Sequence, residues 1–325
     1  MKVTPLLKIL AEKGGSDLYL STGAPPSAKF SGKLTPLSKD RAPPGWVESL
    51  ANEIMSDKQR EAFKHKPEMN LALSLPNIGR FRVNIFKQRN ETSMVIRNIV
   101  TEIPNLKDLG LPDVLEKVIM LKTGLILFVG GTGSGKSTSL AALIDHRNRN
   151  SSGHIITIED PIEYQLEGIS QMKVAGKKGM NFSTSLRHVL RQDPDVIMVG
   201  EVRDIETARM AIQSSLTGHL VFSTLHTNDS AGAVTRLLDL GLEPYLVSSS
   251  LIAVMAQRLV RKICSDCKEE YEPAPQELRA LGLGNGRTSL DQEKPQKFFR
   301  GSGCDRCFQT GYRGRTGVYE LMLVD

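Results

Sequence analysis

The eight residues from 130 to 137 constrain the fold of this chain more than any other stretch. Their sequence, GGTGSGKS, fits the pattern G-x-x-x-x-G-K-[ST] of phosphate-binding loops. The apolar run 125–129 before the loop predicts a buried strand, and residues 139–144 after it predict a helix. A strand, a glycine-rich turn and a helix N-terminus in this order form an anion site, because successive backbone N–H groups turn inward. A chance glycine-rich turn is the alternative, and both flanks argue against it.

The loop predicts ATP and Mg²⁺ as its ligands. Lys136 is expected to reach the β- and γ-phosphates, and the Ser137 hydroxyl is expected to hold Mg²⁺. The residues predicted to bind the nucleotide are Gly130, Gly131, Thr132, Gly133, Ser134, Gly135, Lys136 and Ser137.

Composition excludes some classes of protein. The chain has 325 residues, of which 40% are hydrophobic and 24% charged, as in ordinary globular proteins. Its apolar runs fall short of the roughly 20 residues of a membrane span. Lys8 interrupts the apolar residues near the N-terminus, which therefore predict an amphipathic helix and not a signal peptide. We expect a cytoplasmic protein.

The net charge of +6 permits contact with nucleic acid but does not require it. Basic residues are interleaved with acidic ones, and aromatic residues make up only 5% of the chain. A platform for single-stranded nucleic acid needs basic and aromatic residues together. A solvated surface is the expected reading, with no direct nucleic-acid contact.

The order of predicted elements indicates an α/β fold in two domains. Residues 1–100 read as a small α/β domain, in which 46–64 form a helix and 79–88 a strand with alternating burial. Residues 101–112 contain Pro104, Gly110 and Pro112 and read as a linker. From 113 to 325 strands and helices alternate, which predicts a parallel sheet covered by helices. Its strands are expected at 125–129, 154–158, 196–199 and 220–224, followed by an apolar helix over 245–260.

Polar residues follow three of these strands. The carboxylates of Glu159, Asp160 and Glu163 follow strand 154–158, where they could polarise water or Mg²⁺ or lie in a solvated loop. Glu201 follows strand 196–199, which has the form of a Walker B element. His219 and His226 flank strand 220–224, too far apart along it to share a metal. Each histidine could be a hydrogen-bonded strand end, or it could sense a γ-phosphate.

The four cysteines form two C-x-x-C pairs, which predict a structural Zn²⁺ site. Two such pairs close a tetrahedral metal site, and four thiolates leave no coordination position open for catalysis. Disulfides are the alternative, and a cytosolic setting disfavours them. An excursion over 268–303 separates the pairs, within a zinc-binding insert at about 262–310. The predicted ligands are Cys264, Cys267, Cys304 and Cys307.

The phosphate loop, the Glu-Asp-Pro segment, the Asp-Pro-Asp…Gly-Glu segment and the Thr-Gly-His…Leu-His segment together resemble the secretion and pilus ATPases. The resemblance implies that Glu163 activates the attacking water, that Glu201 is the Walker B glutamate and that His226 is the His-box histidine. It also implies that Arg82 and Arg97 reach the nucleotide from the N-terminal domain. Considered alone, these two arginines would be read as an exposed strand face.

The same resemblance implies a PAS-like N-terminal domain, a RecA-like ATPase domain and a homohexameric ring that drives a pilus or pseudopilus platform protein at the inner membrane. The chain reads as a mosaic. Residues 79–84 and 143–148 look like retraction ATPases, whereas residues 190–193 and 311–317 and the cysteines look like secretion and pilus-assembly ATPases. It begins almost directly with the nucleotide-proximal domain and lacks the C-terminal marker of retraction ATPases. The alternatives are a RecA-like DNA translocase and a nucleotide-binding regulator that does not hydrolyse.

Overall fold

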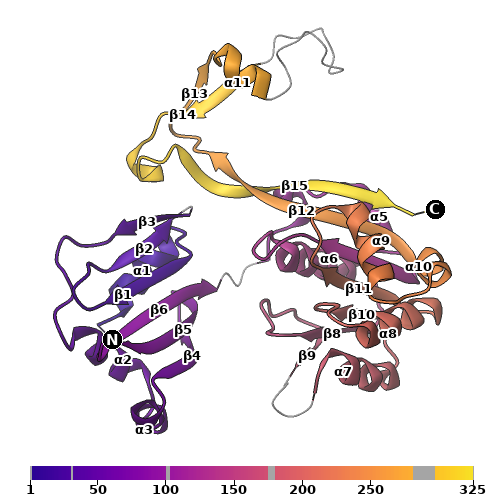
Figure 1. The fold of residues 1–325 in the computed structure, drawn as a ribbon, viewed down its shortest axis with the longest axis horizontal. Coiled ribbons are helices and arrows are strands. Elements are labelled where there is room, and N and C mark those ends of the chain that lie inside the picture. Colours follow the sequence, from indigo (N-terminus) through magenta and orange to yellow (C-terminus); the bar gives the residue numbers. More distant parts are fainter. Residues whose placement is uncertain (1, 31, 100–102, 175–179, 281–296, 325) are drawn as a thin grey trace. The chain divides into compact units, whose positions relative to one another are not determined.

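The computed structural model describes residues 2–30, 32–99, 103–174, 180–280 and 297–324 (Figure 1). Residues 260–316 form one compact unit, and residues 1–259 with 317–325 form another. The expected domain end at residue 100, the start of the linker at 101–102 and the middle of the cysteine excursion at 281–296 lie outside the described residues. Among the described residues, no helix combines the length and hydropathy that a membrane crossing requires.

The first part of the chain forms a six-stranded antiparallel sheet in the order β3-β2-β1-β6-β5-β4. In β5 the side chains of Phe81, Val83 and Ile85 are buried, which confirms the predicted alternation. The strands are β1 (Asp17–Ser21), β2 (Ser27–Phe30), β3 (Lys33–Pro36), β4 (Glu68–Leu75), β5 (Gly79–Gln88) and β6 (Glu91–Ile99).

Three helices accompany this sheet: α1 (Thr4–Glu12), α2 (Trp46–Ile54) and α3 (Asp57–His65). The prediction of one helix over 46–64 is wrong, because the first helix ends at Ile54 and a second begins at Asp57. Ser56 and Gln59 form a capping box that starts α3: the Ser56 hydroxyl accepts from the Gln59 N–H, and the Gln59 side chain accepts from the Ser56 N–H.

The rest of the larger unit contains a seven-stranded sheet in the order β15-β12-β7-β11-β10-β8-β9. The strands from β12 to β9 run parallel, so their carboxyl ends meet at one edge. The strands are β7 (Gly124–Val129), β8 (Ile155–Glu159), β9 (Ser170–Lys173), β10 (Val196–Val199), β11 (Leu220–Leu225), β12 (Leu251–Ile263) and β15 (Tyr312–Leu323). The four predicted parallel strands are thus present.

Helices cover both faces of this sheet. Alternate residues of β7 explain why: Leu125 and Leu127 pack into one apolar core, and Ile126 and Phe128 into the other. The first core contains side chains of α7 (Phe182–Val189), α8 (Ile205–Leu216), α9 (Ser230–Asp239) and α10 (Pro244–Ser250). The second contains side chains of α4 (Leu106–Leu109), α5 (Val114–Val118) and α6 (Lys136–Asn150). The short 3₁₀ helix η2 (Leu190–Gln192) follows α7.

The predicted helix over 245–260 is wrong beyond Ser250. The chain turns there from α10 into β12, which pairs in parallel with β7. Residues 251–256 are apolar without interruption, and such a run fits a strand buried on both faces as well as a buried helix. Pairing with β7 decides for the strand, because it satisfies the backbone of both segments.

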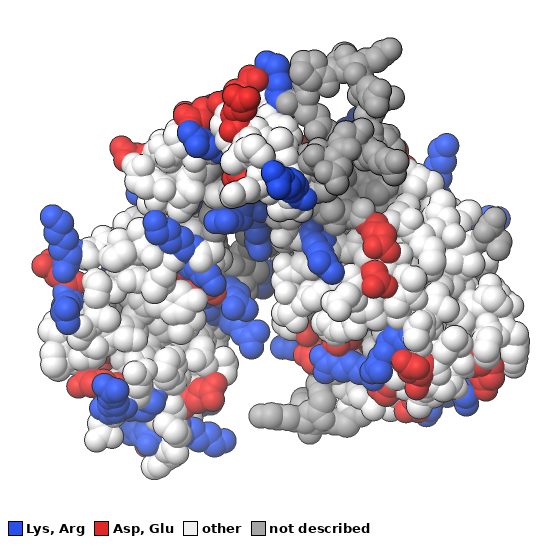
Figure 2. All heavy atoms as spheres, turned by 45° about the horizontal axis from the view of Figure 1, so that its top comes forward, with Lys and Arg blue, Asp and Glu red and all other residues white. Residues whose placement is uncertain are grey.

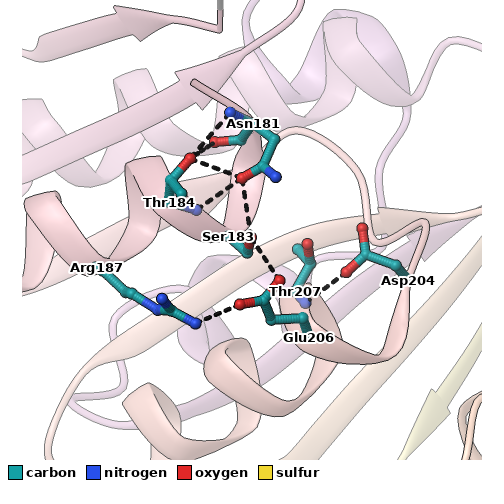
Figure 3. Close-up of polar contacts among 7 residues, drawn as sticks. All are labelled: Asn181, Ser183, Thr184, Arg187, Asp204, Glu206 and Thr207. Carbon is teal, nitrogen blue, oxygen red and sulfur yellow. Dashed lines mark hydrogen bonds and ion pairs between the residues drawn. The ribbon is translucent and has the colours of Figure 1, made fainter. Parts of the chain in front are cut away.

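A polar clamp fixes the start of α8, the helix that follows Glu201 (Figure 3). The Asp204 carboxylate caps α8 by accepting from the Thr207 N–H at 2.8 Å. The Glu206 carboxylate accepts a hydrogen bond from Ser183 of α7 and pairs with Arg187 of the same helix. Asn181 caps α7 in turn. The clamp therefore ties the start of α8, the helix after β10, to α7, the helix before it.

The smaller unit contains a short antiparallel ribbon between β13 (Lys268–Tyr271) and β14 (Phe298–Gly301). A helix, α11 (Pro275–Ala280), follows β13, and a 3₁₀ turn, η3 (Asp305–Cys307), lies between the last two cysteines. The backbones of Gly301 and Gly311 approach so closely that a Cβ on either glycine would collide with the other residue. Only glycine fits at this crossing.

Candidate functional site

The phosphate loop lies between β7, which is buried throughout, and the first residue of α6. Gly133 and Gly135 have positive φ angles of 77° and 93°, which glycine adopts without strain. No heavy atom lies within 4 Å of the position that a Cβ would take on Gly131 or Gly133, so this side of the loop is open to a ligand. The Ser134 hydroxyl is buried without a hydrogen-bond partner in the described structure. An orphaned donor beside open glycines fits a phosphate cradle.

Lys136 folds back onto the loop. Its ammonium donates to the carbonyl oxygens of Gly130 at 2.7 Å and Gly131 at 3.0 Å. Burial lowers the pKa of Lys136, and the negative charges of Glu201 and Glu163 act in the opposite direction. The three charged groups that the sequence assigned to one site are therefore electrostatic neighbours.

Gln257 of β12 supports the loop from behind. A Cβ on Gly130 would lie 2.5 Å from the Gln257 carbonyl oxygen, and a Cβ on Gly135 would lie 2.7 Å from its Nε2. The buried Gln257 side chain also accepts a hydrogen bond from the Ser139 hydroxyl at 2.9 Å. The loop thus packs directly on β12, which explains the glycines at its two ends.

Glu201 is held between Arg203 and His226. One carboxylate oxygen accepts from Arg203 Nε at 2.7 Å, and the other lies 3.1 Å from His226 Nε2. Burial raises the pKa of Glu201, but the hydrogen bonds and charges of Arg203 and His226 outweigh burial and keep it below its usual value. The pairing raises the pKa of Arg203 correspondingly. Glu201 is thus an ionised, oriented carboxylate.

Side chains of β11 fix the backbone at this point. The Thr224 hydroxyl donates to the Gly200 carbonyl and the Ser223 hydroxyl to the Val199 carbonyl, both at 2.7 Å. The Gly200 N–H donates to the Ile158 carbonyl at 2.8 Å. These bonds satisfy backbone groups where β10 leaves the sheet.

The acidic loop after β8 uses its three carboxylates differently. The Glu159 carboxylate is engaged within the protein, because it accepts from the Thr157 hydroxyl at 2.6 Å and from Gln171 Nε2 at 3.0 Å. Burial raises the pKa of Glu159. Asp160 and Glu163 are exposed, and Asp160 precedes a cis peptide bond to Pro161. Glu163 is therefore the exposed carboxylate of this loop whose negative charge raises the pKa of Lys136 against the effect of burial.

The two histidines that flank β11 differ. His219, just before the strand, contacts the Ser214 carbonyl through Nδ1 at 2.9 Å. This contact agrees with one of the two alternatives from the sequence, a histidine that is hydrogen-bonded at the end of a strand. His226, at the other end, contacts Glu201.

Arg82 and Arg97 lie directly opposite each other on β5 and β6 of the antiparallel sheet. Both are exposed, and Arg97 Nε donates to the Asp17 carboxylate at 3.0 Å. Asp17 is itself buried. Because this bond uses Nε, it leaves the two terminal guanidinium nitrogens of Arg97 to other partners. A role at a nucleotide stays a prediction for both arginines.

The sequence did not single out Arg203, Gln171 or Gln257 for the site. Arg203 lies two residues after Glu201. In extended backbone this spacing puts two side chains on the same side, and it could have indicated that they pair. Gln171 and Gln257 belong to strands whose register with β8 and β7 brings them to the loops. No local pattern marks such contacts.

The four cysteines gather at one point in the smaller unit. Their sulfur atoms all lie within 4.8 Å of one another, and the measured Sγ–Sγ distances include 3.9 Å (Cys264–Cys304), 3.8 Å (Cys267–Cys307) and 3.7 Å (Cys304–Cys307). A tetrahedral Zn²⁺ with Zn–S bonds of about 2.3 Å separates its sulfurs by about 3.8 Å. All four cysteines are free thiols and not disulfides.

Backbone donors favour the thiolate in this cluster. Cys307 Sγ accepts from the N–H groups of Cys304 at 3.2 Å and Gly311 at 3.3 Å. Although burial opposes them, these donors lower the pKa of Cys307 to about 6. Burial and the neighbouring thiols instead raise the pKa of Cys267 to about 12, so it is the donor type and the sulfur spacing that fit a Cys₄ zinc site.

Charges of both signs share the molecular surface. Figure 2 shows Asp and Glu side chains among the Lys and Arg side chains of the face drawn. Exposed ion pairs such as Arg187–Glu206 and Arg209–Glu243 join residues of opposite charge and leave the net charge of +6 unchanged.

Known proteins share this arrangement. The family described as "Type II/IV secretion system protein" matches residues 40–325. Type II secretion system ATPase E of Vibrio cholerae is 53% identical over 213 residues, covering 66% of this chain and 41% of that protein. Type IV pilus ATPase PilU of Pseudomonas aeruginosa is 45% identical over 269 residues, covering 80% of this chain and 70% of that protein. The chain spans less than half the length of the secretion relatives that it matches.

A solved structure extends the likeness to the fold. The crystal structure of the pilus retraction motor PilT with bound ADP has a TM-score of 0.75 and 34% identity, covering 100% of this chain and 84% of that one. This likeness confirms the predicted α/β fold with a RecA-like P-loop sheet. The chain belongs to the type II/IV secretion system protein family.

Proposed function

We propose that this chain hydrolyses ATP as the motor subunit of a type II secretion or type IV pilus machine. One observation carries the proposal: Lys136, Glu163, Glu201 and His226, which follow four different strands, are brought to the carboxyl edge of one parallel sheet. The names of the relatives and the ADP in PilT support it.

In this proposal each side chain has a distinct task. The loop N–H groups and the Ser134 hydroxyl bind phosphate oxygens, and Lys136 exchanges its two carbonyl partners for them. Ser137, helped by Glu201, would hold Mg²⁺, which neutralises charge on the phosphates. Glu163 orients and deprotonates the attacking water, since it is exposed and unpaired by any described side chain. His226, through its contact with Glu201, responds to the γ-phosphate.

Arg82 and Arg97 are proposed to complete the charge stabilisation. A guanidinium spreads its permanent charge over phosphoryl oxygens, and it does so best when its planar fork is oriented in advance. The Nε bond from Arg97 to buried Asp17 supplies that orientation on the protein side. Alanine at either position should lower the rate of hydrolysis more than the affinity for ATP.

We further propose a structural Zn²⁺ on Cys264, Cys267, Cys304 and Cys307. The sulfur spacing near 3.8 Å and the N–H donors to Cys307 support it. Metal analysis of the purified protein should find one zinc per chain, and Cys264→Ser should lose it.

The remaining proposals concern assembly. We propose a homohexameric ring in the cytoplasm, docked on an inner-membrane platform protein of the pilus or secretion machine. A division into an N-terminal domain (1–100), a linker (101–112) and an ATPase domain (113–325) with its cysteine insert is proposed for each subunit. Sedimentation with and without ATP tests the ring directly.

ATP turnover tests the central proposal. Wild type should release phosphate, Lys136→Ala should lose nucleotide binding, and Glu201→Gln should bind ATP but turn over about 100-fold more slowly or less. Glu12→Gln, an exposed glutamate paired with Lys8, serves as the matched control. Strong stimulation by DNA would favour a translocase, and binding without turnover would favour a regulator.

A further inference from the structure

The acidic loop that carries Glu163 is held by a residue outside it. Strands β8 and β9 pair in parallel with Thr157 opposite Gln171, so the Gln171 side chain lies beside the carboxyl end of β8. From there it reaches three groups of the segment 159–166. Its Nε2 donates to Glu159 Oε1 at 3.0 Å and to the Tyr164 carbonyl at 2.9 Å, and its Oε1 accepts from the Leu166 N–H at 2.9 Å.

These three bonds use both donors and the acceptor of one amide group. They fix the loop at its first residue, near its middle and at its end. Leu166 is buried, so the end of the loop is anchored by packing as well. A single side chain on a neighbouring strand therefore sets the path of the loop.

Glu163 lies between the fixed points. The carbonyl of the next residue, Tyr164, accepts from Gln171 Nε2 at 2.9 Å. The Tyr164 hydroxyl pairs with the Thr138 hydroxyl at 2.9 Å, which ties the loop to the first turn of α6. The Glu163 side chain itself makes no such bond in the described structure and stays exposed. The backbone is thus held while the carboxylate is left free.

We propose that Gln171 is a positioning residue that holds the acidic loop, and with it Glu163, in the geometry that ATP hydrolysis needs. The inference rests on the proposed function, because it assigns Glu163 a part in turnover. It adds a residue that contacts no nucleotide and acts only through the acidic loop.

Gln171→Met tests this, because methionine keeps the length and volume of the side chain and removes all three hydrogen bonds. We expect kcat to fall between about tenfold and 100-fold, since a misplacement of about 1 Å can cost that much. The Kd for a non-hydrolysable ATP analogue should change less than about twofold, because the phosphate loop is untouched. Gln213→Met, on the exposed face of α8, is the matched control and should leave both values unchanged.

Hydrogen exchange of the nucleotide-free protein gives a readout that does not need turnover. In Gln171→Met, peptides covering 159–166 should lose protection, while peptides covering β10 and β11 should not. An unchanged kcat with active wild type would overturn the role of Gln171 and leave the ATPase proposal intact. Unchanged protection of 159–166 would overturn it whether or not the protein hydrolyses ATP. If wild type shows no turnover but Gln171→Met still loses protection over 159–166, only the ATPase proposal is refuted.

Discussion

Glu201 keeps its negative charge in mildly acidic solution because Arg203 and His226 stabilise the carboxylate. Arg203→Met removes the stronger of these partners and should raise the pKa of Glu201. The acid limb of the kcat/KM profile against pH, which reports groups of the free enzyme, should then move to higher pH. A pH–rate series on wild type and variant measures the displacement.

The lowered pKa of Glu201 also determines how the stability of the fold changes with pH. A carboxyl whose pKa is lowered by folding contributes stability above its unfolded pKa, and this is lost as pH falls through the folded value. Arg203→Met should therefore be less stable than wild type at neutral pH, with the difference shrinking in acid. Arg209→Met, which breaks the exposed pair with Glu243, is the control. An acid limb that stays in place would show that Glu201 does not titrate in the reaction.

The glycines of the phosphate loop should differ in their tolerance of a methyl group. Gly130→Ala would place its Cβ 2.5 Å from the Gln257 carbonyl oxygen at a φ of 141°, and no side-chain movement relieves a backbone clash. We expect a loss of stability of about 2 kcal/mol or more. Gly131→Ala meets open space and should fold like wild type. Thermal denaturation compares them, and equal melting temperatures would contradict the packing of β12 on the loop.

At the residue scale, the sequence placed Glu201 and His226 each at the end of a strand of a predicted parallel sheet. Their contact was not predicted, because it depends on the pairing of β10 with β11. Gln171 and Gln257 could not be found in this way. Their contacts depend on strand register and on the order β12-β7-β11, which no local pattern encodes.

At the scale of elements, apolar runs predicted the strand positions well. They failed where the same run could form either a helix or a strand. Four short buried runs became β7, β8, β10 and β11; the bounds of β10 are as predicted, and those of the other three differ by one residue at one or both ends. The run after Ser250 could be helix or strand, and only its place beside β7 selects the strand. The division between α2 and α3 was missed because no Pro or Gly marks it. The signal there is the capping box that begins α3.

The unit of residues 260–316, which contains the four cysteines, should depend on the proposed Zn²⁺ for its stability. Among its described residues this unit has a small two-stranded ribbon and few buried side chains, so thiolate–metal bonds would supply much of the free energy that holds it together. Chelation should therefore raise hydrogen exchange in 264–271 and 298–311, while β7, β10 and β11 keep their protection. Cys264→Ser should reproduce the effect.

Ser265→Ala is the control, since it changes the neighbouring hydroxyl and leaves all four ligands in place. Gly301→Ala adds an independent test, because its Cβ collides with Gly311, whose N–H donates to Cys307 Sγ. It should weaken zinc retention without removing a ligand. Protection that survives chelation would mean that the fold of this unit precedes the metal.

At the scale of the whole molecule, two different constructions share one chain. The antiparallel sheet presents the arginine pair, and the parallel sheet presents the phosphate loop, the acidic loop and the Glu201–His226 pair. The proposed motor would need hydrolysis in one place to change geometry in another, and two separate sheets that each carry part of the predicted site are suited to that.

Coupling between subunits is the property on which the motor proposal finally depends. If sites fire in order around a closed ring, a subunit that binds ATP but cannot cleave it should stall its neighbours. Mixing wild type one-to-one with Glu201→Gln before assembly would leave half of the activity if sites are independent. If one blocked subunit stops a closed ring of six, only about 2% of randomly mixed rings remain active. The rate of phosphate release is measured at a series of mixing ratios. Independent sites give a rate that falls in a straight line with the fraction of Glu201→Gln, and ordered firing gives a steep curve. A straight line, with rings present by sedimentation, would reject ordered firing while leaving hydrolysis by each subunit in place.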